Sequence, residues 1–304
     1  MRDPGGLYDL ATGIVPVPGD LHLVAGLTGF ADAGSAVSRV GDYLLETLDA
    51  TEVATFDTDA LLDYRARRPT MHFDEDHLSG YEPAKLSLYL MSDELGQPFL
   101  FLTGFEPDFQ WERFTAAVVQ LVERYGVKDT TWVHSIPMPT PHTRPIGVTV
   151  SGNRQDLIES MSVWRPRTQV PANALHLLEY RLQELGHPTA GFVLLIPHYL
   201  ADTEYPQAAV TALESISAAT GLIFPTDRLR EENREFVAKV DDQVSGNQEL
   251  QRLVATLEER HDSYMEDNPL PSPLVDESGE LPTADTIAAE LERFLSQRRD
   301  RDGA

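Results

Sequence analysis

Cysteine is absent from the 304 residues, and this absence excludes several classes of function. Disulfides, thiolate nucleophiles, iron–sulfur clusters and cysteine zinc sites all need a thiol sulfur. Complete catalytic motifs are missing too. None of the nine histidines has HExxH or HxH spacing, and there is no GxSxG elbow of a serine hydrolase. We therefore expect no metal site and no cofactor.

Basic charge is scarce: 24 Lys and Arg stand against 49 Asp and Glu, which gives a net charge of −25. Such a surface repels phosphate backbones and anionic lipid, so we expect no nucleic-acid and no membrane partner. Long apolar runs are also missing. No stretch approaches the roughly 18 apolar residues of a membrane span, and residues 1–10 lack the apolar core of a signal peptide. The default expectation is a cytoplasmic protein.

The stretch from residue 21 to residue 48 organises the chain. An apolar run at 21–25 leads into three glycines, and an amphipathic segment follows at 37–48. A short buried strand, a glycine-bearing loop and a helix are the usual start of an α/β sheet. In such folds ligands bind beyond the carboxyl ends of the strands.

Strand-like and helix-like segments alternate up to about residue 220, which predicts a mixed or mainly parallel sheet between helical layers. The polar stretch 70–80 is interpreted as a loop. The stretch 137–145 has four prolines and is interpreted as a long loop of the kind that often carries function. The predicted strands are 51–56, 85–91, 98–103, 129–135, 146–150 and 189–196, and the predicted helices are 111–125, 172–185 and 206–220.

The chain divides into four predicted segments. The core is followed by an acidic helical hairpin that Ser245 and Gly246 break in two, as two antiparallel helices require. A proline-rich linker and a last helix over about 283–297 come after it. The predicted segments are an irregular lead-in at 1–20, an α/β core domain at 21–222, a helical hairpin appendage at 223–266, and a linker with a terminal helix at 267–304.

The glycines after the first strand fit no complete nucleotide motif. Gly26, Gly29 and Gly34 are spaced GxxGxxxxG rather than GxGxxG, and Ser35 stands where a phosphate loop needs lysine. A close-packed structural turn is the favoured interpretation, and a ligand loop is the alternative. The candidate ligand-binding residues are Gly26, Thr28, Gly29 and Gly104.

Four side chains near strand ends are candidates for acid–base chemistry. Asp32 follows the first strand and Glu106 follows the strand at 98–103, while His134 or His198 would carry a proton. For Glu106 the favoured alternative is that it simply starts the helix containing Trp111, and for the histidines that they are hydrogen-bonded structural residues. Asp32 belongs to the glycine loop, for which the structural turn is favoured.

Arg65, Arg67 and Arg68 form a local basic cluster in an acidic chain. Three guanidinium groups suit a phosphate or carboxylate ligand. Pairing with acidic residues of a neighbouring subunit is the favoured alternative.

Four segments together resemble the proteasome assembly chaperone two family, in its actinobacterial branch. The resemblance covers about residues 20–260 and implies a three-layer α/β/α sandwich with a mixed sheet, similar to nucleoside phosphorylases and related hydrolases. It also implies self-association, with a trimer favoured. The segments are VAGLTGFADAGSAV at 24–37, DYRARRP at 63–69, PFLFLTGFEPDFQWERF at 98–114 and IPMPTPHTRP at 136–145.

Two functions follow as hypotheses. The first is a self-associating, non-catalytic protein that binds other proteins in the manner of an assembly chaperone. The second is a nucleoside- or phosphate-type enzyme or sensor that uses the strand-end loops. The helical segment after residue 222 extends beyond the core pattern of the family.

Overall fold

The computed structural model describes residues 3–13 and 16–268. Within them, eight strands form one sheet in the order β1-β3-β6-β7-β2-β8-β10-β9. The strands are β1 (Tyr8–Leu10), β2 (His22–Thr28), β3 (Ala50–Phe56), β6 (Leu86–Ser92), β7 (Pro98–Phe105), β8 (Asp129–Met138), β9 (Gly147–Gly152) and β10 (Thr189–Pro197).

The middle of the sheet is parallel and its edges are antiparallel. β7, β2, β8 and β10 run in parallel. β6, β3 and β1 continue antiparallel on one side, and β9 pairs antiparallel with β10 on the other. The first predicted strand, β2, lies at the centre and is buried along nearly its whole length. The predicted mixed sheet is confirmed.

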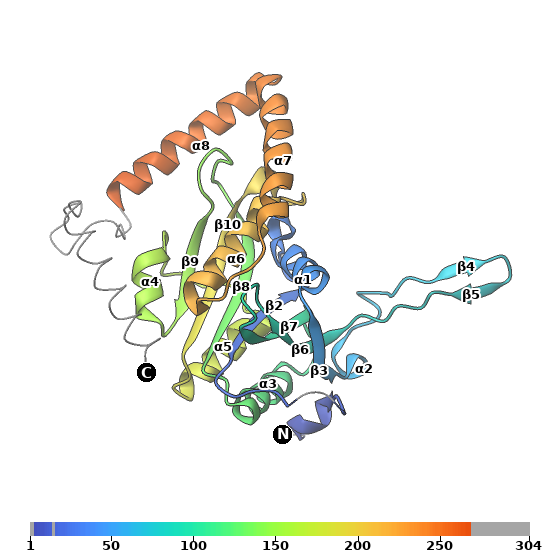
Figure 1. Cartoon of the computed structure of the whole chain (residues 1–304). Coiled ribbons are helices and arrows are strands. Elements are labelled where there is room, and N and C mark those ends of the chain that lie inside the picture. The colour runs from blue at the N-terminus through green and yellow to red at the C-terminus, as the bar shows by residue number, and fades with distance from the viewer. Residues whose placement is uncertain (1–2, 14–15, 269–304) are drawn as a thin grey trace.

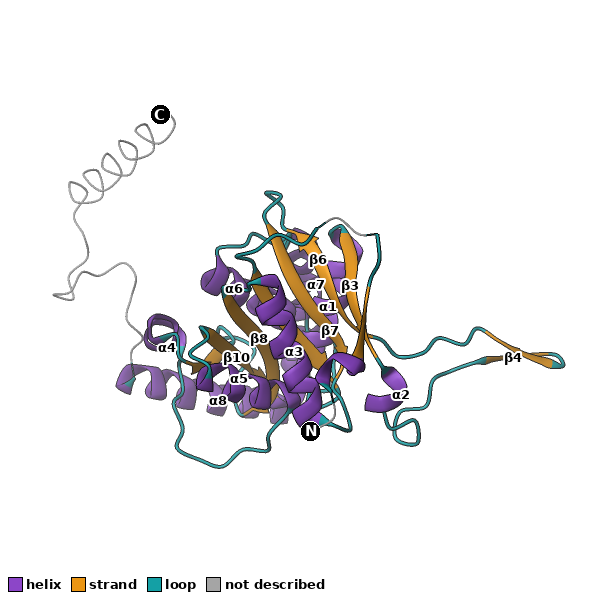
Figure 2. Cartoon of the chain, turned by 90° about the horizontal axis from the view of Figure 1, so that it is seen from below, coloured by secondary structure: helices purple, strands orange, loops and turns teal. Residues whose placement is uncertain are grey.

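Helices cover both faces of the sheet, as Figures 1 and 2 show. On one face α1 (Ala36–Thr47) and α6 (Pro206–Thr220) pack into a core that includes Val24 and Val133. On the other face α3 (Trp111–Tyr125) and α5 (Ala174–Glu184) pack into a second core. The predicted three-layer α/β/α sandwich is therefore confirmed.

A helical hairpin follows the sandwich, as predicted. α7 (Asp227–Ser245) buries Leu229 and Val240 against the layer of α1 and α6. α8 (Gln248–Asp267) begins after Gly246, with the Asn247 side chain accepting hydrogen bonds from the first-turn N–H groups. Figure 1 shows α8 running from the tip of α7 back across the β9 end of the molecule. A short helix that the sequence did not predict, α4 (Gln155–Met161), packs on β9.

The stretch interpreted as a polar loop instead forms a two-stranded ribbon. β4 (His72–Asp74) and β5 (His77–Ser79) pair antiparallel on extended connections that project away from the body (Figure 1). We call residues 71–81 the arm. Three-residue strands rich in charged and histidine side chains leave too little periodicity to distinguish them from a loop.

Other parts of the chain add to this frame. The expected irregular lead-in contains η1 (Pro4–Leu7), which buries Leu7, and the edge strand β1. Short helices follow β3, β2 and β10: α2 (Thr58–Leu61), η2 (Ala33–Ser35) and η3 (His198–Leu200). The expected linker and terminal helix fall almost wholly on residues 269–304, outside the described residues. No helix in the described part is long and apolar enough to cross a membrane.

Gly104 is the position where a side chain would cost most. Its φ is +135°, and an added Cβ would lie 2.1 Å from the backbone oxygen of Lys85. We expect Gly104→Ala to lower the free energy of unfolding by about 3 kcal/mol or more, measured by urea titration. Gly96→Ala is the matched control, because φ is +79° there but no atom lies within 4 Å, and about 1 kcal/mol is expected. Equal losses in the two variants would contradict the close approach.

Candidate functional site

The loops after the parallel strands meet at one edge of the sheet. Residues 29–32 follow β2 and residues 106–108 follow β7. His134 and Ser135 lie within β8, where Ser135 pairs with Asp32 just beyond the end of β2. This edge is where ligands bind in open α/β sheets. We call it the strand-end cluster.

Asp32 closes the start of α1. Its Oδ1 accepts from the backbone N of Val37 at 2.7 Å, and its Oδ2 accepts from the backbone N of Ser38 at 2.9 Å. The hydroxyls of Ser38 and Ser135 donate to the same carboxylate at 2.7 and 3.3 Å. A helix N-terminus attracts an anion because its first N–H groups lack partners. Asp32 therefore fills the place that a bound anion would take.

Glu106 plays the same part at α5. Its Oε1 accepts from the backbone N of Ala174, the first residue of that helix, at 2.7 Å. Burial raises the pKa of Glu106, although the hydrogen bond from Ala174 and the charge of Arg67 act in the opposite direction. The two candidate carboxylates thus lie at the same edge of the sheet. Each accepts hydrogen bonds from backbone N–H groups at the start of a helix.

Arg67 holds the loop after β7 in place. Its Nη2 donates to the backbone oxygen of Glu106 and to Oδ2 of Asp108, both at 2.6 Å. Its guanidinium also lies over the ring of Phe105, 5.3 Å from the centroid. Arg65 and Arg68 are exposed and form no ion pair within the described residues. The basic cluster is therefore divided between one internal clamp and two outward-facing cations.

His134 is 4 % exposed and stacks on Phe30, with 5.6 Å between the ring centroids. Its Nε2 has no hydrogen-bond partner in the described part of the chain. Burial, with a smaller contribution from nearby His176, lowers the pKa of His134 to about 4. A proton carrier works best with a pKa near the operating pH, so this environment suits a neutral scaffold residue. His198 is exposed in η3, beside the ring of Tyr199.

The four candidate ligand-binding residues all have packing roles. A Cβ at Gly26 would lie 3.1 Å from Cγ1 of Val37, and one at Gly29 would lie 2.9 Å from Nη1 of Arg67. Thr28 Oγ1 donates to the backbone oxygen of Gly104 at 3.2 Å. These contacts agree with the structural-turn interpretation, while ligand contact at these residues stays a prediction.

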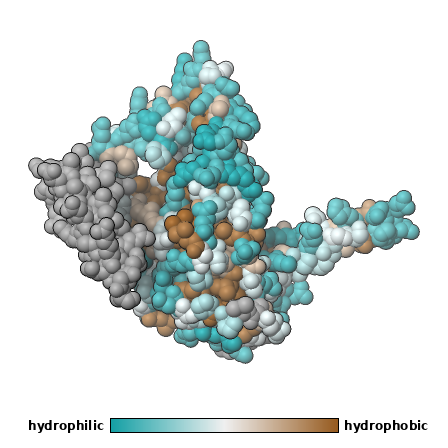
Figure 3. Space-filling model, viewed as in Figure 1, coloured by the Kyte–Doolittle hydropathy of each residue, from teal (hydrophilic) through white to brown (hydrophobic). Residues whose placement is uncertain are grey.

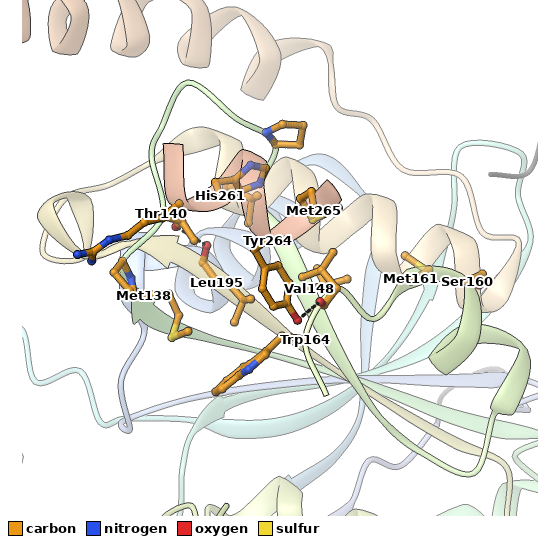
Figure 4. A pocket seen from close by; sticks show the side chains of 16 residues that line it. Met138, Thr140, Val148, Ser160, Met161, Trp164, Leu195, His261, Tyr264 and Met265 are labelled. Atoms are coloured by element: carbon orange, nitrogen blue, oxygen red, sulfur yellow. Dashed lines mark hydrogen bonds between the residues drawn. The ribbon is translucent and has the colours of Figure 1, made fainter. Parts of the chain in front are cut away.

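A cavity of about 630 Å³ lies elsewhere, between α8, α4, β9 and the loop after β8 (Figure 4). We call it the α8 cavity. None of the strand-end candidates lines it. Its wall is largely apolar and contains Met138, Val148, Met161, Trp164 and Met265. The sequence analysis missed this cavity because four separate segments build it, although the proline-rich loop was singled out.

Polar contacts fix α8 over this cavity. The Tyr264 hydroxyl donates to the backbone oxygen of Val163 at 2.9 Å. Arg144, in the proline-rich loop, binds Asp262 at 2.6 Å and Glu258 at 3.2 Å. Because these contacts cross from α8 to two other segments, the cavity has a defined roof.

The described residues contain no group of three or more His, Asp or Glu side chains arranged to hold a metal ion. The protein is an α/β/α sandwich with a projecting arm and a separate apolar cavity. The carboxylates of its strand-end cluster are already hydrogen-bonded to helix starts.

Comparisons with known proteins identify the family. The model of the PAC2 family matches residues 26–244, so the chain belongs to this family. A Mycobacterium tuberculosis protein of unknown function is 40 % identical, with a TM-score of 0.80, over 88 % of this chain and 93 % of that one. A Corynebacterium glutamicum protein of unknown function is 34 % identical, with a TM-score of 0.82, over 86 % and 98 %.

A more distant structure has the same fold. A proteasome-assembly chaperone homologue from Mycobacterium tuberculosis is 19 % identical, with a TM-score of 0.70, over 77 % of this chain and all of that one. No curated protein matches the chain. The resemblance inferred from the four sequence segments is thereby confirmed at the level of the family.

The environment of His134 predicts a pH effect on stability. The pKa is about 4 in the folded protein against 6.5 for an exposed histidine, so the unfolded chain takes up the proton first as the pH falls. Stability from this residue is present above pH 6.5 and is lost toward pH 4. Between pH 7 and pH 5 the loss is about 2 kcal/mol.

We expect His134→Phe, which keeps a ring on Phe30, to remove this part of the pH dependence of the unfolding free energy. Urea titrations at pH 7 and pH 5 measure it. His198→Phe is the matched control at an exposed histidine and should retain the wild-type pH dependence. If the His134→Phe variant also retains the wild-type pH dependence, the imidazole of His134 is not protected from protonation in the folded wild-type protein.

Proposed function

We propose that this protein is a non-catalytic, self-associating protein-binding factor of the assembly-chaperone type. The observation that carries the proposal is the arm. Membership of the PAC2 family and the largely occupied strand-end cluster support it.

The arm has one apolar and one polar face. Phe73 and Leu78 are paired across the ladder, so their side chains stand together on one face, and they are 73 % and 60 % exposed. His72 and Ser79 form the neighbouring pair on the other face. Figure 3 shows the arm as a narrow projection with apolar and polar side chains. An isolated two-stranded hairpin is only marginally stable in water, so a partner that covers the apolar face would also stabilise the arm.

The enzyme or sensor alternative has less support. Asp32 and Glu106 are both held by backbone N–H groups at helix starts, and the lowered pKa of His134 disfavours a proton carrier at neutral pH. The large apolar cavity lies away from all three residues. A catalytic site at the strand ends would require these groups to exchange their present partners.

The proposed partners are a second copy of this chain and other proteins, in a cytoplasmic setting, with a trimer as the favoured assembly. Structural neighbours include a proteasome-assembly chaperone homologue and an archaeal proteasome activator from Pyrococcus furiosus. Proteasome subunits are therefore the first class of protein to test.

The experiment combines light scattering, for the mass of the full chain at physiological salt, with binding to purified proteasome subunits. For the wild-type protein we expect a mass above that of one chain. The double variant Phe73→Ser/Leu78→Ser should weaken the association of the protein with its partners at least about 30-fold, because buried apolar anchors are lost. Leu95→Ser is the matched control, since Leu95 is 76 % exposed but lies in the turn between β6 and β7. A monomer that binds no proteasome subunit would refute the proposal.

A further inference from the structure

We propose that residues 283–297 of this chain form an amphipathic helix whose apolar side chains insert into the α8 cavity of the same chain. We call these residues the amphipathic segment. They lie outside the described residues, so the proposal rests on their sequence, on the position where α8 ends and on the wall of the cavity. It goes beyond the proposed function, because the contact is made within one copy.

The amphipathic segment has the residue pattern of a surface helix. Its large apolar residues are spaced i, i+4, i+7 and i+8, so in a helix they share one face. These residues are Ile287, Leu291, Phe294 and Leu295. Thr283 is a suitable N-cap residue, and Arg298 and Arg299 follow the last turn, where the helix dipole favours cations. A helix of about 15 residues is only marginally stable alone in water, so its apolar face needs a surface to pack on.

The segment begins within reach of the cavity. Tyr264 and Met265 line the cavity and belong to the last turn of α8, which ends at Asp267. The connection at 269–282 has 14 residues and can span at most about 46 Å, more than the length of about 30 Å of α8 itself. A segment tethered in this way has an effective concentration on the order of millimolar, which favours contact within the chain over contact between chains.

The cavity offers the apolar surface that such a helix needs. Its wall consists mainly of aliphatic, aromatic and methionine side chains (Figure 4). Met138, Met161 and Met265 are flexible and polarizable, so they can adapt to inserted leucine and phenylalanine side chains. A space of about 630 Å³ takes a few large side chains but not a helix, which is about 10 Å across. The helix would therefore lie against the cavity with its backbone hydrogen bonds made internally and its apolar face inserted.

Charge complementarity accompanies the apolar match. Arg260 lines the cavity, and the exposed residues Arg165 and Arg167 follow its wall residue Trp164. None of these three arginines forms an ion pair within the described residues. Residues 269–292, which include most of the amphipathic segment, contain six acidic and no basic residues. In a chain with a net charge of −25, this local meeting of opposite charges favours the cavity over other surfaces.

The arm fits the same segment less well. It presents its apolar side chains on a narrow ribbon, and its tip at 74–76 carries three exposed acids that repel an acidic stretch. The acids of α8 near the cavity roof are different, because Glu258 and Asp262 are both paired with Arg144. The α8 cavity is thus the apolar surface that an acidic amphipathic helix can approach.

Because the chain has no cysteine, disulfide trapping in the full-length protein tests the contact directly. Ser160→Cys places a thiol at an exposed position of α4 that lines the cavity. It is combined with Leu291→Cys or with Leu295→Cys on the apolar face of the segment. Ser296→Cys is the matched control, because residue 296 lies on the opposite face of the predicted helix. Under mild oxidation we expect at least one of the two apolar-face pairs to close within one chain at least about 10-fold faster than the control pair.

Dye binding measures whether the segment covers the cavity. The probe is 1-anilinonaphthalene-8-sulfonate, which fluoresces on apolar protein surfaces. We expect Leu291→Ser/Phe294→Ser to bind the dye at least about 10-fold more tightly than the wild type, because the cavity is uncovered. Ala289→Ser/Arg293→Ser, on the polar face of the predicted helix, is the matched control and should bind the dye like the wild type. Adding Ser160→Trp to the first variant should remove the gain, since the tryptophan fills the cavity.

Four results would overturn the inference. Two are equal disulfide rates for the apolar-face and control pairs, and a Leu291→Ser/Phe294→Ser variant that binds no more dye than the wild type. A third is a disulfide that joins two chains, which would assign the cavity to a second copy. The fourth is a small apolar molecule retained by the purified wild-type protein, seen as added mass in native mass spectrometry and lost in Ser160→Trp. None of these results depends on proteasome subunits or on the mass of the assembly, so the proposed function is tested separately.

Discussion

The capping of two helix starts by half-buried carboxylates is the interaction on which the strand-end cluster depends. Asp32 satisfies the first N–H groups of α1, and Glu106 satisfies the first N–H group of α5. These helices lie on opposite faces of the sheet, so the two carboxylates fix both outer layers to the ends of its parallel strands. Unpaired N–H groups buried there would be costly, which explains the presence of negative charge at an edge that ligands use in other α/β folds.

The strand ends are engaged in holding the fold, and the exposed apolar side chains of the arm and the α8 cavity lie toward the two ends of the sheet instead. The arm projects from the body of the protein between β3 and β6, and the α8 cavity lies beside β9. The arm connects two antiparallel strands near one edge of the sheet, and the cavity lies mainly beside the antiparallel edge strand β9. Because of this separation, the residues of the arm and the cavity can change without loss of the hydrophobic core. Structural neighbours with the same fold are indeed only 19 % and 23 % identical to this chain.

The helical hairpin is a structural part of this arrangement. α7 contributes Leu229 and Val240 to the main core, and α8 is held by Arg144 and by the Tyr264 hydroxyl. His142 strengthens the connection, since its backbone N–H donates to the Tyr199 hydroxyl at 2.7 Å and its Nε2 lies 3.1 Å from Oδ1 of Asp241 in α7. The proline-rich loop is thereby tied to both helices of the hairpin, and the cavity forms between α8, α4 and the sheet edge.

Local patterns in the sequence were enough to predict the main helices, the central strands and the mixed α/β/α sandwich, because apolar periodicity reports which face of a segment is buried. They also placed Asp32 and Glu106 at a common edge, since both follow strands that proved to be parallel neighbours. Only the tertiary structure showed that these carboxylates are occupied by helix starts and that Arg67 is an internal clamp. It alone revealed the arm and the α8 cavity, because strand pairing and a wall built from four distant segments are set by long-range contacts that no local pattern records.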